Sequence, residues 1–144
     1  MLDVKHEQKG FAGMAENRNV VLITGASRGL GWAVAHAFAR RGAALILTAR
    51  ENGALQRAAE ELGRSTDVLA LSGDVADRRH VEQLVDGAES RFGRIDVLIN
   101  NASTVGPSPM PSLERYPVEA LDTVFRINVL APLALIQRAL PLLH

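Results

Sequence analysis

Three glycines gather in the segment TGASRGLG, residues 24–31, between a β-branched apolar run and a helical pattern. Gly25 can adopt the backbone angles of a tight turn, Gly29 lets a ligand approach the main chain, and Gly31 allows close packing of the helix. The first N–H groups of a helix and the positive end of its dipole suit a pyrophosphate. The segment therefore predicts a phosphate-binding loop. Because its Gly-x-x-x-Gly-x-Gly spacing differs from the commoner Gly-x-Gly-x-x-Gly pattern, a glycine-rich turn without a ligand is the alternative.

Two arginines near this segment supply positive charge. Arg50 follows the second predicted strand, about 20 residues after the last glycine, and Arg28 lies within the glycine segment. At the position of Arg50, a carboxylate normally holds a ribose 2′-hydroxyl. An arginine there instead accommodates a 2′-phosphate, which it can bind with two parallel hydrogen bonds. The sequence thus favours NADP(H) over NAD(H). The alternative is that both arginines are surface residues and that Glu51 pairs with one of them.

The composition excludes several other functions. The 144 residues carry 16 basic and 16 acidic side chains, a balance that predicts no nucleic-acid or anionic-membrane partner. Cysteine is absent, which rules out disulfides and thiolate chemistry and fits a cytoplasmic location. No metal site is expected, because the four histidines lack the i,i+4 pairing of a helical metal site. No apolar run reaches the roughly 18 residues of a membrane span, and no export signal is evident.

Buried strands and helices alternate along the chain. Continuous apolar runs are typical of strands covered on both faces, and helical spacing follows each of them. The predicted strands are residues 20–24, 44–49, 67–72 and 95–100. The predicted helices are residues 29–43, 51–63, 77–93 and about 118 to the end. Strict alternation predicts an α/β, Rossmann-like fold: a partial doubly wound parallel sheet of four strands in the order 3-2-1-4, with helices on both faces.

Four motifs resemble those of the short-chain dehydrogenase/reductase family, in the family's order. They are TGASRGLG at 24–31, Asp74–Val75 after the third strand, NNAS at 100–103 after the fourth, and Ile127–Val129 in the last helix. The resemblance covers about residues 18–144. It implies that this range is a dinucleotide-binding domain of the Rossmann type, incomplete relative to the family. Residues 1–17, before this domain, read as a polar tail.

The resemblance implies a role for each matching residue. Asp74 would accept a hydrogen bond from the adenine amino group, and Val75 would flank the ring. Asn100 would brace the sheet, while Asn101 and Ala102 would line the adenine-side ribose and the approach to the nicotinamide. The diphosphate loop would comprise Gly25, Ser27, Arg28, Gly29, Leu30 and Gly31.

Two departures separate the chain from the family pattern. Ser103 stands where the family prefers glycine, so its Cβ would crowd a cofactor that needs close backbone approach. The family also uses a Tyr-x-x-x-Lys pair, in which the lysine lowers the pKa of the tyrosine. Here the residue four positions after Tyr116 is Ala120, and no lysine follows Lys9. Of the implied catalytic tetrad only Asn128 is present, the residue that would kink its helix and help hold a water in the proton relay.

The resemblance therefore implies the NADP(H)-binding part of an oxidoreductase, truncated before the catalytic Ser and Tyr-x-x-x-Lys motif. The parent reaction would be hydride transfer between nicotinamide C4 and a carbonyl or secondary alcohol, and this chain alone is expected to be inactive. The alternative, from another functional class, is a non-catalytic module that binds nucleotide or docks through an exposed sheet edge and the last helix.

The last helix is apolar on most of its faces, a pattern that predicts burial. We expect a bend at Pro132 and one apolar stripe that runs the length of the helix. The predicted stripe comprises Leu121, Val124, Phe125, Asn128, Leu135, Ile136, Ala139, Leu140 and Leu143. In the resembled family this helix packs on the sheet and helps to form a subunit interface, so the resemblance implies a homo-oligomer.

Overall fold

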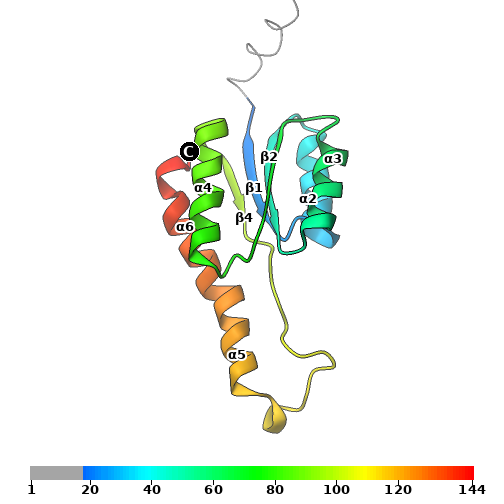
Figure 1. The fold of residues 1–144 in the computed structure, drawn as a ribbon, viewed down its shortest axis with the longest axis vertical. Coiled ribbons are helices and arrows are strands. Elements are labelled where there is room, and N and C mark those ends of the chain that lie inside the picture. The colour runs from blue at the N-terminus through cyan, green and yellow to red at the C-terminus, as the bar shows by residue number, and fades with distance from the viewer. Residues whose placement is uncertain (1–17) are drawn as a thin grey trace, which may run out of the picture.

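The computed structural model describes residues 18–144, and the polar tail predicted at residues 1–17 lies outside the described residues. Strands and helices alternate as predicted up to the fourth strand (Figure 1). These elements are β1 (Val20–Thr24), α2 (Gly29–Ala39), β2 (Ala44–Ala49), α3 (Asn52–Leu62), β3 (Val68–Ser72), α4 (Arg78–Phe92) and β4 (Val97–Ile99). A longer irregular segment with one 3₁₀ turn (Leu113–Arg115) then leads to the last helical stretch.

The last helical stretch contains four elements. They are α5 (Val118–Phe125), a π-helical segment (Arg126–Leu130), α6 (Ala131–Ala139) and a 3₁₀ turn (Leu140–Leu142). α5 and the irregular segment before it extend beyond the carboxyl ends of the strands (Figure 1). Within residues 18–144, no helix has the length and apolar character needed to cross a membrane.

All four strands run parallel in one sheet, in the predicted order β3-β2-β1-β4. Helices α2 and α3 cover one face, and α4 and α6 cover the other (Figure 1). This arrangement confirms the predicted α/β, doubly wound architecture. The strand order reverses between β1 and β4, and open α/β sheets bind ligands in the crevice outside the carboxyl ends of strands at such a point.

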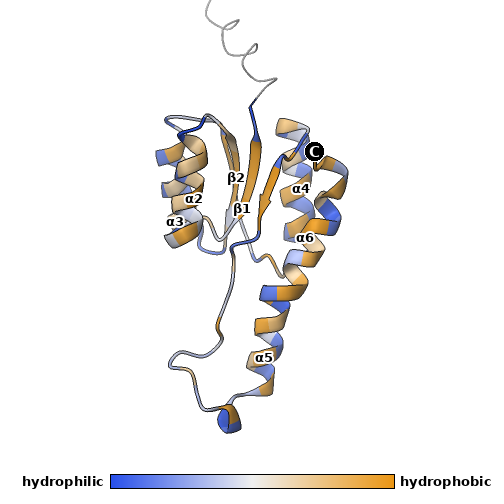
Figure 2. Ribbon diagram, turned by 180° about the vertical axis from the view of Figure 1, so that it is seen from behind, coloured by the Kyte–Doolittle hydropathy of each residue, from blue (hydrophilic) through white to orange (hydrophobic). Residues whose placement is uncertain are grey.

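Successive residues of β1 point to opposite faces of the sheet, and both faces are buried. Val20 and Leu22 join the core beneath α4 and α6, whereas Val21 and Ile23 join the core beneath α2 and α3. Figure 2 accordingly shows strands that are apolar along their length, between helices of mixed character. Burial on both faces explains why the strands are continuous apolar runs in the sequence.

Asp96 ties together the beginnings of the neighbouring strands β1 and β4. Its Oδ2 accepts a hydrogen bond of 2.7 Å from the N–H of Val20, and its Oδ1 accepts one of 3.1 Å from Nε of Arg94. Burial by itself would raise the pKa of Asp96. The hydrogen bonds from Val20 and Arg94, together with the positive charge of Arg94, outweigh burial and hold the pKa below its ordinary value.

The substitution Asp96→Asn is expected to lower the free energy of unfolding by about 1 kcal/mol at neutral pH, because it removes a charged acceptor. The pKa of Asp96 is lower in the folded chain than its ordinary 3.8, so its contribution is present above that pH and is lost as the pH falls through the folded value. Urea denaturation at several pH values should therefore show a difference between wild type and variant that shrinks in acid. A difference that stays constant across the acid range would contradict this account.

Ile95, the first residue of the fourth predicted strand, pairs with the last residues of the chain, whereas the N–H of Asp96 already donates to the carbonyl oxygen of Val20 in β1 at 2.8 Å. Ile95 forms an isolated parallel bridge with Leu143, and the N–H of Ile95 donates to the carbonyl oxygen of Leu142 at 2.8 Å. The regular part of β4 is therefore shorter than the predicted 95–100. Among the described residues, no strand lies beside the outer edge of β4.

The last helical stretch departs from the single apolar stripe expected of it. A π-helical turn contains an extra residue, so an α-helical stripe does not continue through it. Pro132 lies in the first turn of α6, directly after this π segment. The buried residues are Ile127, Ala131, Leu135, Ala139 and Leu142. Of the predicted stripe, Leu135 and Ala139 are buried and Val124 and Leu143 are half-buried in the single chain. The other members, Leu121, Phe125, Asn128, Ile136 and Leu140, are exposed in it.

Candidate nucleotide-binding site

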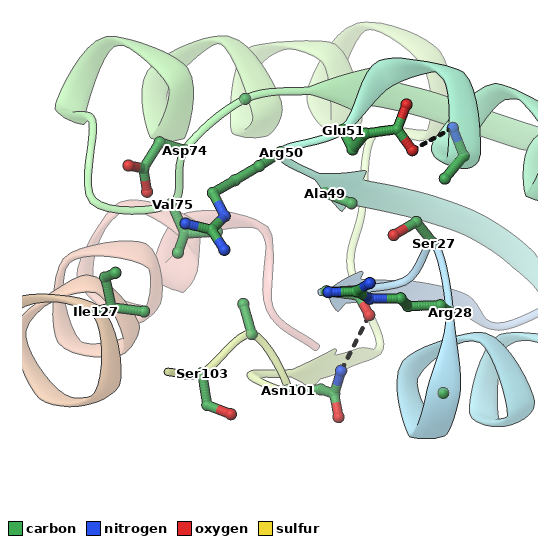
Figure 3. A pocket seen from close by; sticks show the side chains of 15 residues that line it. Ser27, Arg28, Ala49, Arg50, Glu51, Asp74, Val75, Asn101, Ser103 and Ile127 are labelled. Carbon is green, nitrogen blue, oxygen red and sulfur yellow. Dashed lines mark hydrogen bonds between the residues drawn. The ribbon is translucent and has the colours of Figure 1, made fainter. Parts of the chain in front are cut away.

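A cleft of about 560 Å³ opens at the carboxyl ends of the strands, where the strand order reverses. It lies between the glycine segment, the turn after β2, the loop after β3 and the segment after β4 (Figure 3). The lining residues are Gly25, Ser27, Arg28, Gly29, Ala49, Arg50, Glu51, Ala54, Gly73, Asp74, Val75, Asn101, Ala102, Ser103 and Ile127. Four connecting segments that are far apart in the sequence thus share one opening.

The glycine segment needs its glycines for two different reasons. Gly25 and Gly29 have φ values of 66° and 58°, in the left-handed region that side chains with a Cβ rarely adopt. Gly31 lies within α2, and a Cβ there would lie 2.5 Å from Nδ2 of Asn101 and closer still to the carbonyl oxygen of Gly25. Gly31 therefore packs against the loop itself, and no other residue fits without displacing main chain.

The start of α2 is open to an anion. Arg28, the residue before the helix, has an extended backbone, and its side chain caps no N–H group. The first turn of α2 contains no acidic residue. Ser27, Arg28 and Gly29 line the cleft here, so free N–H groups and the positive end of the helix dipole border it.

Asn101 and Thr24 fasten the glycine segment to β4. Nδ2 of Asn101 donates to the carbonyl oxygens of Thr24 and Gly25, both at 3.1 Å. Oγ1 of the buried Thr24 accepts the N–H groups of Asn101 and Ala102, each at 3.0 Å. Asn101 thus braces the glycine segment, whereas its neighbour Asn100 is exposed, and the sheet-bracing role expected of Asn100 stays a prediction.

Arg28 and Arg50 both point into the cleft (Figure 3). Each is exposed, and within residues 18–144 no carboxylate lies within ion-pair distance of either one. Glu51, the expected alternative partner, instead caps α3: its Oε2 accepts the N–H of Ala54 at 2.8 Å. Two guanidinium groups therefore remain available to an anionic ligand.

The opposite wall of the cleft comes from the loop after β3. Oδ1 of Asp74 accepts the N–H of Ala76 at 2.9 Å, and this hydrogen bond shapes the loop. Oδ2 of Asp74 makes no hydrogen bond to a protein group within residues 18–144. Val75 packs against Ile127 and Ala131 of the last helical stretch. The two predicted adenine-side residues thus lie together on one wall, as the sequence suggested.

Three predicted site residues lie outside the cleft lining. Leu30 is 70% exposed, and Gly31 acts through packing. Asn128 lies in the π segment, where its Oδ1 accepts the N–H of Thr104 at 2.9 Å and its Nδ2 donates to the carbonyl oxygen of Thr104 at 2.8 Å. This pair of bonds fastens the helix to the segment after β4.

Five lining residues are not among the predicted site residues: Ala49, Glu51, Ala54, Gly73 and Ile127. Two of them, Ala49 and Glu51, flank Arg50 and could have been included by position alone. Gly73 precedes the Asp74–Val75 pair, and only the fold shows that it borders the cleft. Ile127 opens the Ile127–Val129 motif, but that motif indicated Asn128 as the site residue, and only the fold shows that Ile127 borders the cleft.

The fold and the cleft define a Rossmann-like α/β domain with an open cleft at the carboxyl ends of β1 and β4. The family described as short chain dehydrogenase matches residues 19–144. The chain belongs to this family, the short-chain dehydrogenases/reductases.

Relatives of known name and structure agree with this membership. The chain is 39% identical over 116 residues to 1-deoxy-11-beta-hydroxypentalenate dehydrogenase of Streptomyces arenae, covering 80% of this chain and 41% of that one. L-sorbose reductase from Gluconobacter frateurii, solved with NADPH and L-sorbose, is 33% identical with a TM-score of 0.80, over 86% of this chain and 47% of that one. An alcohol dehydrogenase from the archaeon Thermococcus sibiricus, solved with 5-hydroxy-NADP, is 33% identical with a TM-score of 0.81, over 87% of this chain and 53% of that one. The chain thus spans about half of the length of these relatives, or less.

Proposed function

We propose that residues 18–144 bind a nicotinamide dinucleotide, NADP(H) in preference to NAD(H), as the cofactor-binding part of a short-chain dehydrogenase/reductase. The observation that carries this proposal is a cleft in which an uncapped helix start lies beside two arginines without acidic partners in the described range. Two similar solved structures contain NADPH and 5-hydroxy-NADP, which supports the same type of cofactor. The cytoplasmic location expected from the composition stays a prediction.

The cleft residues suit the separate parts of such a cofactor. The first N–H groups of α2 would hold the pyrophosphate, and Arg28 and Arg50 would bind the 2′-phosphate. Asp74 would accept from the adenine amino group, with Val75 against the ring. Asn101 and Ala102 would line the adenine-side ribose, and Ser103 would border the approach to the nicotinamide. Gly25, Ser27, Gly29, Leu30 and Gly31 would shape the diphosphate loop.

The nicotinamide, when bound, supplies hydride transfer between its C4 and a carbonyl or secondary alcohol. The chain's own residues would position that ring, and Asn128 would serve the proton relay from the π segment. The relay also needs a Tyr-x-x-x-Lys pair, which this sequence does not contain. We therefore propose that this chain alone binds the cofactor but does not reduce a carbonyl, and turnover of NADPH with a carbonyl substrate by the purified chain would overturn that part of the proposal.

The substitution Arg50→Asp tests the choice of cofactor. It removes a cation and places a carboxylate where it would repel the 2′-phosphate and accept from a ribose hydroxyl. We expect the affinity for NADPH relative to NADH to fall by about a hundredfold, which corresponds to about 2.8 kcal/mol. Energy transfer from Trp32, the single tryptophan, to the reduced nicotinamide provides the titration.

Arg64→Asp is the matched control, because Arg64 is also an exposed arginine without a recorded acidic partner in the described range but does not line the cleft. It makes the same change of net charge. A similar drop in NADPH affinity in both variants would mean that Arg50 acts only through net charge. No drop in either would remove the basis for preferring NADP(H).

A second candidate function, a non-catalytic interaction module, is favoured by one observation. The last helical stretch exposes Leu121, Phe125, Val129, Leu133, Ile136 and Leu140, a large apolar surface for a monomer. The same surface supports the proposal that the chain forms a homo-oligomer through this stretch. Nucleotide titration combined with size-exclusion chromatography separates the two functions: an oligomer that binds NADPH favours the cofactor-binding part, and an oligomer indifferent to nucleotide favours the module.

A further inference from the structure

His80 is a buried histidine that the proposed cofactor contacts leave unused. It lies in the first turn of α4, is 5% exposed, and places its Nε2 2.7 Å from Oγ1 of Thr48. Thr48 is itself fully buried and is the last residue but one of β2. The imidazole therefore joins α4 to the end of β2, directly beneath the loop that forms the adenine-side wall of the cleft.

Gly73 is the point at which His80 contacts that wall. A Cβ at this position would lie 2.5 Å from Cε1 of His80 and closer still to other atoms of the ring. The N–H of Gly73 donates to the carbonyl oxygen of Ala49 at 3.0 Å, which attaches the start of the loop to β2. The imidazole thus occupies the volume that a side chain at residue 73 would need, and it supports the loop from behind.

We propose that His80 is a positioning residue, which holds Gly73, Asp74 and Val75 in place against the adenine end of the bound dinucleotide. The inference rests on the proposed function for the identity of the ligand, while the support of the loop is a property of the free chain. His80 contacts no ligand in this scheme. It acts through Gly73 and through its hydrogen bond to Thr48.

The charge state of His80 follows from its surroundings. Burial lowers the pKa of the imidazole, and the nearby Asp77 and Asp74 only partly offset this effect. From β2 the group that faces the ring is the neutral hydroxyl of Thr48, and the acidic groups that act on it come from the loop and from the start of α4. His80 is therefore neutral at neutral pH, and protonation in acid would oppose the buried position of the ring.

A double-mutant cycle tests the contact between residues 73 and 80. Gly73→Ala should weaken NADPH binding by about tenfold or more, because the new methyl group displaces either the ring or the loop. His80→Ala should weaken it by about tenfold, because the support is lost. The double variant should bind more tightly than Gly73→Ala alone, because the removed ring leaves room for the methyl group.

The pH dependence of NADPH binding distinguishes a positioning role of His80 from a merely structural one. His80→Gln keeps a neutral partner for Thr48 but cannot be protonated. As the pH falls below 6.5, the ordinary pKa of histidine, the ratio of wild-type to His80→Gln dissociation constants for NADPH should rise. The titration of the ligand's own 2′-phosphate cancels in this ratio. A ratio that is independent of pH would overturn the inference.

Amide exchange separates a failure of this inference from a failure of the proposed function. In the free chain, the N–H of Gly73 should exchange faster in His80→Ala than in Val85→Ala, which removes a buried core side chain more than one turn further along α4. Equal exchange at Gly73 in these two variants would overturn the positioning role. If exchange behaves as expected but wild type binds neither NADPH nor NADH, the support of the loop stands, and the cofactor assignment is wrong.

Discussion

Replacing Gly31 with alanine is expected to weaken NADPH binding by about a hundredfold or more, corresponding to at least about 2.8 kcal/mol. The added Cβ would overlap the carbonyl oxygen of Gly25, a main-chain atom of the glycine segment, and would press on Nδ2 of Asn101. Overpacked positions typically cost about 1–3 kcal/mol when neighbours can move, but here the neighbour is backbone that must keep its shape to hold a pyrophosphate. Helix propensity opposes the expected loss, because alanine is favoured over glycine inside a helix by about 1 kcal/mol.

Helix propensity favours alanine at residue 31 and overlap with the glycine segment disfavours it, so Gly31→Ala distinguishes the two effects. If Gly31 were merely a tolerated helix residue, Gly31→Ala would stabilise the chain and leave binding unchanged. Gly29→Ala is the comparison, because its Cβ would meet nothing within 4 Å and the cost there is the φ of 58° alone. We expect Gly29→Ala to destabilise the chain by about 1–2 kcal/mol. Tryptophan energy-transfer titration with NADPH and urea denaturation, applied to both variants, distinguish overlap from backbone strain.

Replacing Thr24 with valine is expected to lower the free energy of unfolding by about 1–3 kcal/mol. Valine has nearly the shape of threonine, so packing is retained while Oγ1 is lost. The N–H of Ala102 then loses its acceptor at the junction of β1 and β4, whereas the N–H of Asn101 keeps the carbonyl oxygen of Ile99 at 3.1 Å. Ala102 is half-buried, and an N–H left without an acceptor costs about 1–3 kcal/mol where water cannot replace it.

The control for this substitution is Thr24→Ser, which keeps the hydroxyl and removes only a methyl group. We expect it to cost about 1 kcal/mol, and to retain NADPH binding. Thr24→Val should lose both stability and binding, because Asn101 shapes the glycine segment through the same junction. Urea denaturation followed by Trp32 fluorescence measures the first effect. Equal stability of the valine and serine variants would show that water replaces the missing acceptor.

The strands and their order were predictable because their signals are local. β1 and β2 begin and end at the predicted residues, since apolar runs buried on both faces stop at a glycine or a charge. The glycine segment was likewise predictable as a tight turn into a helix, because the turn and the start of α2 determine each other over a few residues. The alternation of elements then leaves few topologies, and the observed order is the one expected for right-handed crossovers.

What the sequence did not reveal depends on contacts between distant segments. Asn100 and Asn101 are identical in type, and only the approach of β4 to the glycine segment shows that Asn101 braces that segment. The π segment adds one residue to a turn without any local signal, so one continuous stripe does not run through it: Leu135 and Ala139 are buried, whereas Leu121 and Phe125 are exposed. His80 reads as one scattered histidine until the fold places it against Thr48.

The junction between Thr24 and Asn101 joins residues that are 77 positions apart in the chain. Closing such a long loop is slow and entropically costly, so local pieces such as β1 with α2 form before it closes. The turn of the glycine segment can therefore form early in folding, before the hydrogen bonds of Asn101 give it its final shape. Dinucleotide binding would then require the completed sheet, and a ligand that recognises only the completed sheet stabilises the whole domain by mass action. If the proposed dinucleotide binds, the same contact that shapes the loop would make the last stage of folding sensitive to the concentration of that dinucleotide.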